Sequence, residues 1–272
     1  MHKTSVSVIV PTYQPQEYIK ECLSALNSQT LDRELYEVII ILNGCDEPYK
    51  TYLHNIIDSM TCKVHMIHTM QGGVSNARNL GIDAAEGEYL FFQDDDDYIT
   101  SNYLEAMLQL AAPDVIPISN AIAFEDKTRN EVPSYRQTHW YKKYSPNRKQ
   151  PYYNIRGYFS GPWMKLIHRD IVGNRRYDTR FDNGEDGLFN FLISDRFNYV
   201  DFAPEDVIYY RRYRDSSAIS KLKFNRRIFN NNIRLMKTMT SIYLVGGYNT
   251  HFYLTRMLAI MHTLISSMKR LR

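Results

Sequence analysis

The feature that most constrains the fold is an alternation of short apolar runs with helix-periodic segments over the first 97 residues. The clearest run, Tyr36–Leu42 (YEVIIIL), is typical of a strand buried on both faces of a parallel sheet. Ser5–Val10, which Pro11 ends, Lys63–Ile67 and Glu88–Gln93 are expected to be strands as well. Segments with helical spacing separate them. This order predicts an α/β fold with an open, mostly parallel central sheet flanked by helices.

Beyond about residue 120 the pattern loosens. Phe124–Trp163 has little periodicity, and so much irregular chain in a compact protein is usually a lid or a binding loop. Gly187–Ser194 is expected to be a helix and Tyr199–Tyr210 to hold short strands. Lys223–Leu244 and His251–Leu271 are expected to form two C-terminal helices.

Composition places the chain among globular proteins, with 44% hydrophobic and 23% charged residues. The three cysteines, Cys22, Cys45 and Cys62, show no CxxC spacing, which argues against a disulfide framework and a zinc site. The first residues do not resemble a secretory signal. We therefore expect a reducing, cytoplasmic setting.

Charge is unevenly distributed along the chain. Residues 211–272 hold thirteen Lys/Arg and one acid, whereas the rest of the chain is acidic. This basic tail predicts an anionic partner, and nucleic acid and the inner face of the plasma membrane both fit. No segment reaches the ~18 uninterrupted apolar residues of a membrane span. The alternatives for the tail are a peripheral membrane contact and packing on the protein or on a second copy in a homo-oligomer.

Four consecutive aspartates, Asp94–Asp97, follow a strand that is expected to be buried. Ligands of open α/β sheets gather outside the carboxyl ends of the strands. Clustered carboxylates there lower their mutual repulsion by binding a hard cation, Mn²⁺ or Mg²⁺. Such a cation can bridge the phosphates of a nucleoside diphosphate.

Two other enzyme classes use similar features. A phosphatase with an aspartate nucleophile carries DxD after its first strand with a nearby threonine, whereas this run follows the fourth strand and precedes Tyr98. A dinucleotide enzyme needs a glycine-rich turn after the first strand, where this chain has Pro11–Gln14. Both classes fit poorly.

Six motifs in order resemble the family 2 glycosyltransferases, which are inverting enzymes of the GT-A fold. They are VSVIVPTYQ (Val6–Gln14), YEVIIILNGC (Tyr36–Cys45), GGVSNARNLGIDAAEGEYLFFQDDDD (Gly72–Asp97), SGPWMKLIHRD (Ser160–Asp170), RFDNGEDGLF (Arg180–Phe189) and YYRRYRDSSAIS (Tyr209–Ser220). The resemblance implies a GT-A domain over residues 1–220. Residues 1–120 would be the nucleotide-sugar-binding half, residues 121–220 the acceptor half, and residues 221–272 a basic amphipathic helical tail.

The resemblance also implies which residues bind the nucleotide. These are Pro11, Thr12, Tyr13, Asn43, Arg78, Asp94 and Asp95. The ring of Tyr13 can stack on a base. Asn43 stands where the family usually has an acid that accepts the uracil N3–H, and an asparagine can both accept and donate.

The metal and leaving-group roles follow from the same resemblance. Asp96, with Asp94, is expected to bind Mn²⁺ or Mg²⁺. Arg214, where many relatives have a histidine, is expected to contact the diphosphate together with Ser217, because arginine cannot ligate a metal. Asp97 is expected only to cap the helix that follows it.

Asp186 is expected to be the general base, since inversion needs one carboxylate to take the proton of the attacking hydroxyl. Glu185 is expected to point away from it. Glu185, Trp163 and Lys165 are assigned to the acceptor side. The aromatic, basic loop Trp140–Tyr158 is interpreted as part of an acceptor lid and not as a nucleic-acid site.

The sequence thus predicts transfer of a sugar from a nucleoside-diphosphate sugar, with UDP the expected nucleotide. The expected acceptor is a hydroxyl of a glycan or lipid-linked glycan in cell-surface polysaccharide synthesis. The first alternative is a polyprenyl-phosphate sugar transferase, whose acceptor needs no base. The second is a non-catalytic glycan- or membrane-binding module.

Overall fold

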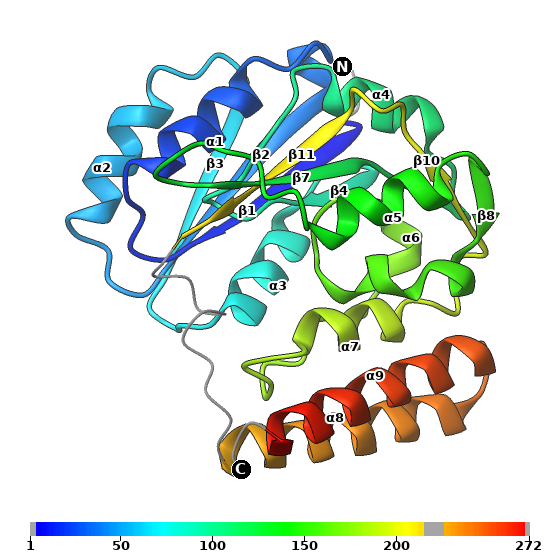
Figure 1. The fold of residues 1–272 in the computed structure, drawn as a ribbon. Helices are drawn as coiled ribbons and strands as arrows, with labels where there is room; N and C mark the ends of the chain where they lie inside the picture. The colour runs from blue at the N-terminus through cyan, green and yellow to red at the C-terminus, as the bar shows by residue number, and fades with distance from the viewer. Residues whose placement is uncertain (1–3, 215–225, 270–272) are drawn as a thin grey trace.

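A computed structural model of the protein describes residues 4–214 and 226–269 (Figure 1). Its central sheet has the strand order β3-β2-β1-β4-β9. The first four strands are parallel, and β9 (Leu166–His168) pairs antiparallel with β4 at the edge. The parallel strands are β1 (Val6–Thr12), β2 (Tyr36–Asn43), β3 (Lys63–Thr69) and β4 (Tyr89–Phe92). The predicted fold class is confirmed.

β1 continues through Pro11, where the sequence predicted its end. β1 pairs with β4 only as far as Ile9, while its pairing with β2 extends to Thr12. Pro11 therefore lies where β1 has a neighbour on one side only, and an edge position tolerates the missing N–H.

Helices pack on the two faces of this sheet (Figure 1). They are α1 (Tyr18–Asn27), α2 (Tyr49–Ile57) and α3 (Val74–Ala84), with a short 3₁₀ turn at Arg33–Leu35. α3 lies against β1 and β2. Its Gly81 allows this close approach, because a Cβ there would lie 2.3 Å from the Ile9 side chain.

Two small sheets complete the second half. β6 (Val115–Ile118), β10 (Tyr199–Phe202) and β8 (Lys149–Pro151) form one. In the other, β11 (Ile208–Tyr213) lies between β5 (Tyr98–Ile99) and β7 (Asn120–Glu125). The intervening helices are α4 (Tyr103–Leu110), α6 (Arg169–Val172) and α7 (Glu185–Leu192). The β5–β11 pairing, which the sequence did not predict, places β11 next to the four aspartates.

The segment expected to be an irregular loop is largely ordered. It contains α5 (Arg136–Tyr144), β8 and a kinked 3₁₀ segment, η2 (Tyr152–Ser160). Tyr141, Tyr158 and Phe159 are buried in the core, so the aromatic residues of this segment hold it on the body of the protein. The lid expectation is wrong for these residues.

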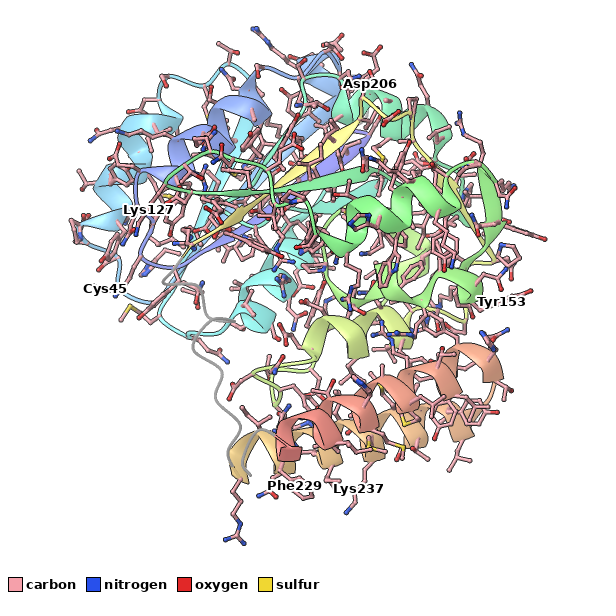
Figure 2. All side chains as sticks on the ribbon, in the orientation of Figure 1. Cys45, Lys127, Tyr153, Asp206, Phe229 and Lys237 are labelled. Carbon is pink, nitrogen blue, oxygen red and sulfur yellow. The ribbon has the colours of Figure 1, made fainter. Side chains whose placement is uncertain are left out.

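The C-terminal helices α8 (Arg226–Val245) and α9 (Thr250–Lys269) form a pair beneath α7 (Figure 1). α8 contacts α7, and α9 contacts η2. Leu235, Met239 and Phe252 join the common hydrophobic core, whereas Phe229 and Lys237 lie on the outer side of α8 (Figure 2). No described helix is long and apolar enough to cross a membrane. The predicted boundary at residue 220, between a GT-A domain and a helical tail, stays a prediction.

Candidate active site

The four aspartates lie at the carboxyl ends of β4 and β1, as expected. Thr12, the last residue of β1, donates its hydroxyl to Asp95. Burial and the charge of Asp96 raise the pKa of Asp95 to about 7. The backbone N–H of Asp94 donates to the Tyr209 hydroxyl at 3.2 Å. The run is therefore held by both the first strand and β11.

Asp97 has a structural role and does not cap a helix. Its side chain is 2% exposed and accepts hydrogen bonds from the Tyr209 hydroxyl at 2.7 Å and the Arg212 backbone N–H at 2.8 Å. The following helix begins at Tyr103, with Asn102 in the cap position. Asp97 thus links β11 to the acidic run. Burial raises the pKa of the Asp97 carboxyl.

Arg78 joins the acidic run to the expected base. This side chain on α3 is 5% exposed. One terminal nitrogen, Nη1, lies 2.7 Å from Asp186 Oδ1, and Nη2 lies 3.3 Å from Asp94 Oδ1. Glu185 Oε1 is a third neighbour, 3.7 Å from Nη1. The geometry makes Arg78 an internal counter-ion for three carboxylates.

Asp186 and Glu185 occupy the first turn of α7, where the helix dipole favours negative charge. The helix begins after Gly184, whose φ of 84° few other residues adopt. The expectation that Glu185 points away from the base is wrong, because the helix starts at Glu185 and both carboxylates reach Arg78. Burial raises the pKa of Asp186 to about 7, although Arg78 opposes the rise.

The ends of the first two strands form the other side of the site. Tyr13 is 57% exposed, and its ring packs against Gly44, where a Cβ would lie 2.8 Å from Tyr13 Cε2. Asn43 is buried. Its amide donates to the Thr12 carbonyl at 2.8 Å, and its Oδ1 accepts the Gly73 backbone N–H at 3.2 Å. Asn43 therefore ties β1, β2 and the start of α3 together.

Arg214 lies on the acidic run, and its expected contact with the diphosphate stays a prediction. Its Nη2 lies 2.6 Å and its Nε 2.8 Å from Asp96 Oδ2, and its guanidinium lies 4.2 Å from the centroid of the Tyr18 ring. Arg212 donates to the Asp96 carbonyl. Ser217 lies outside the described residues. Arg212 was expected to assist Arg214, whereas Tyr18, at the start of α1, and Tyr209, which the β5–β11 pairing brings here, were missed.

The structure contradicts two acceptor-side assignments, because Trp163 and Lys165 are both buried. Trp163 is 5% exposed and stacks on Tyr209, with ring centroids 5.4 Å apart, so a sugar has no free face to contact. Lys165 is fully buried and donates to the carbonyls of Tyr158, Gly161 and Trp163. Burial lowers its pKa to about 7. Both residues are therefore part of the protein interior.

The acidic residues suit a hard divalent cation completed by substrate phosphates. Among described residues, no cluster of three or more His, Cys, Asp or Glu is arranged for a metal. Mg²⁺ commonly takes only one or two carboxylates together with phosphate oxygens and water. The side chains of Asp94 and Asp96 are 32% and 17% exposed and present two carboxylates of this kind. Asp96 and Asp94 would hold the ion, next to Arg214.

Fold and site together define an α/β protein in which aspartates and arginines gather at the carboxyl ends of the strands, beside a buried carboxylate. The pattern described as "Glycosyl transferase family 2" matches residues 7–175. This is more than half of the chain, so the protein belongs to the family 2 glycosyltransferases.

Individual relatives agree with this assignment. EpsH of Bacillus subtilis (strain 168) is 27% identical over 88% of this chain and 69% of its own length. The GalNAc(5)-diNAcBac-PP-undecaprenol beta-1,3-glucosyltransferase of Campylobacter jejuni is 23% identical over 86% of this chain and 74% of its own. The crystal structure of S. aureus TarS 1-349 in complex with UDP-GlcNAc matches with a TM-score of 0.74 and 21% identity. It covers 96% of this chain and 73% of that one, which supports the fold. The chain spans 43% of a longer TarS structure.

Proposed function

We propose that this glycosyltransferase moves a sugar, with inversion, from a nucleoside-diphosphate sugar to a hydroxyl of a glycan or lipid-linked glycan. UDP is the proposed nucleotide, and cell-surface polysaccharide synthesis at the inner face of the membrane is the proposed setting. The observation that carries this proposal is the single side chain of Arg78, which contacts both Asp94 and Asp186. One side chain thereby bridges the proposed donor site and the proposed base.

The similar proteins favour this setting through their printed names. The C. jejuni relative is named for a diphosphate-undecaprenol-linked acceptor. Another relative, GgaB of B. subtilis, 27% identical over 84% of this chain, is named for minor teichoic acid biosynthesis. The TarS structure contains UDP-GlcNAc. These printed names support a nucleotide-sugar donor and an acceptor in cell-surface polymer synthesis.

In the proposed mechanism, the Asp186 carboxylate accepts the proton of the acceptor hydroxyl as the oxygen attacks the anomeric carbon. A single displacement inverts that carbon and needs only one carboxylate in reach. Burial gives Asp186 a pKa of about 7, which makes it a stronger base than an exposed aspartate. Arg214 stabilises the negative charge of the departing diphosphate. A divalent ion at Asp96 would supply further charge neutralisation there.

The exposed ring of Tyr13 should supply stacking energy to the nucleobase. Replacing Tyr13 with alanine should weaken UDP binding by about five- to a hundredfold, since base stacking on an aromatic ring contributes about 1–3 kcal/mol. Tyr13→Phe keeps the ring and should bind UDP within about twofold of wild type. Isothermal titration calorimetry measures both. Equal affinity of the alanine and phenylalanine variants would remove Tyr13 from the base site.

The metal role of the acidic run can be tested without turnover. Mn²⁺ should raise the melting temperature of the UDP-bound protein, because ligands that bind the native state stabilise it. In Asp96→Asn the affinity for UDP with Mn²⁺ should fall by at least about tenfold, as happens when a metal ligand is perturbed. Asp58→Asn removes an exposed carboxylate at the end of α2 and is the matched control. UDP affinity that EDTA leaves unchanged would contradict the metal role.

A thermal-shift and hydrolysis screen of nucleotide sugars, with Mn²⁺ and with Mg²⁺, tests the proposed function as a whole. At least one UDP-sugar should stabilise the protein more than other nucleotide sugars and be hydrolysed slowly in the absence of acceptor. A protein that binds no nucleotide sugar would be a non-catalytic module.

A further inference from the structure

Three arginines gather at a cavity outside the proposed donor site. Arg136 on α5, Arg156 on η2 and Arg256 on α9 come from elements far apart in the sequence. Arg136 and Arg156 line a cavity of about 540 Å³, which Trp140 and His262 also line. Arg256 lies behind it and donates to the hydroxyl of the lining residue Ser160 at 3.3 Å.

Among the described residues, no Asp or Glu forms a salt bridge with these arginines, although Asp186 lies close enough to Arg256 to raise its pKa in part. Arg256 is 6% exposed, and its Nε is buried without a hydrogen-bond partner. Burial and the charge of Arg156 lower the pKa of Arg256 to about 9, and burial with the charge of Arg136 lowers the pKa of Arg156. Arg256 is buried, Arg156 is half-buried and Arg136 is exposed, so the cost of an unpaired cation falls mainly on Arg256 and in part on Arg156. An anion in the cavity would offset the repulsion between Arg156 and its two neighbours.

The cluster adjoins the proposed base. Gly187 follows Asp186 on α7, and a Cβ on Gly187 would lie 2.9 Å from Arg256 Nη1. The absence of a side chain at this position lets the arginine approach the first turn of α7. Arg256 therefore contacts both the cavity-lining residue Ser160 and the turn of α7 that carries the proposed base.

An exposed apolar stripe runs along α9 beside the cavity. Leu254, Leu258, Met261 and Ile265 are 52%, 63%, 44% and 50% exposed, at spacings that put them on one helical face. Leu258 also lines the cavity. A ligand that joins a phosphate to a hydrocarbon chain complements both features. The arginines can pair with its negative charge, and the exposed apolar side chains of α9 can pack against its hydrocarbon chain.

We propose that this cavity binds the diphosphate of a lipid-linked acceptor, with the lipid chain lying along the α9 stripe. The proposal rests on the proposed function, which supplies the reason for an acceptor at this place. Arg136 and Arg156 provide charge-assisted hydrogen bonds to the phosphate oxygens. The guanidinium of Arg136 lies 4.6 Å from the centroid of the Trp140 ring, which orients it at the cavity.

The first test uses geranyl diphosphate as the probe, with UDP and Mn²⁺ in excess so that the donor site is filled. The double variant Arg136→Gln/Arg156→Gln should bind the probe at least about tenfold more weakly than wild type, since each removes a hydrogen bond to a charged group. Lys142→Gln removes one charge from the same helix α5 outside the cavity and should bind within about twofold of wild type. Equal affinity of the double variant and Lys142→Gln overturns the site.

The second test separates the lipid from the phosphate. Leu258→Gln/Met261→Gln should weaken geranyl diphosphate binding several-fold and leave inorganic pyrophosphate binding unchanged. Leu244→Gln, at a 76% exposed position on α8, is the control. If pyrophosphate and geranyl diphosphate bind equally well to wild type, the lipid assignment is overturned. UDP binding is measured separately. Loss of UDP binding would therefore contradict the proposed donor role, whereas loss of geranyl diphosphate binding alone would contradict the proposed phosphate site.

Discussion

Replacing Asp186 with asparagine should reduce sugar transfer by a factor of about 100 to 10,000, the usual contribution of a positioned general base. The exchange is isosteric, and the remaining oxygen can still accept the hydrogen bond from Arg78 Nη1. UDP affinity should therefore stay near wild type. Transfer rates from saturating UDP-sugar, together with calorimetric UDP binding, separate the lost proton transfer from lost binding.

The pH dependence provides a second readout of the same assignment. A base works only when it is deprotonated, and burial raises the pKa of Asp186 to about 7. In the wild type, kcat should therefore fall as the pH drops below about 7, well above the range of an exposed aspartate. Asp186→Asn should lack this acidic limb.

Glu185→Gln is the matched comparison, because it removes the same charge from beside the same arginine. If Asp186 is the base, the Glu185 variant should keep the acidic limb near pH 7 and lose far less activity. Equal losses in the two variants would show that the effect comes from the charge balance around Arg78, and the base assignment would be wrong.

The central sheet was predictable because its signal is local. A run such as Tyr36–Leu42 shows burial on both faces without knowledge of its neighbours, and the βαβ order then limits the topology. The β5–β11–β7 sheet was not predictable for the opposite reason. β5 has two residues, Tyr98 and Ile99, and its partner lies more than a hundred residues away.

The candidate site was likewise predictable only where its residues follow from local sequence signals. Residues at the carboxyl ends of the predicted strands, Thr12 and Asp94 among them, do meet in the structure. Lys165 was misassigned because a lysine is usually exposed, and only the three carbonyls around its ammonium reveal a buried one. Asn43 and Asp97 likewise bond to backbone groups that only the folded chain brings to them.

The other large effect is expected at Arg78. Replacing it with glutamine leaves Asp94, Glu185 and Asp186 close together without their shared cation. Breaking a buried charge pair by removing one partner typically costs about 3–5 kcal/mol, so the free energy of unfolding should fall by about that amount near neutral pH. Arg78→Lys keeps a cation but not the forked geometry and should recover part of the loss.

The sign of the pH dependence distinguishes this electrostatic cause from a packing defect. Without Arg78, the pKa of Asp186 in the folded protein should rise further above its value in the unfolded chain. The extra loss of stability relative to the wild type is small below the wild-type folded pKa of about 7, grows as the pH rises above it, and levels off above the folded pKa of the variant. Urea unfolding should therefore show a larger deficit for Arg78→Gln at about pH 8 than at about pH 5. A deficit that is the same at both pH values would mean that Arg78 stabilises the fold by packing alone and does not hold the carboxylates of the donor site and the base together.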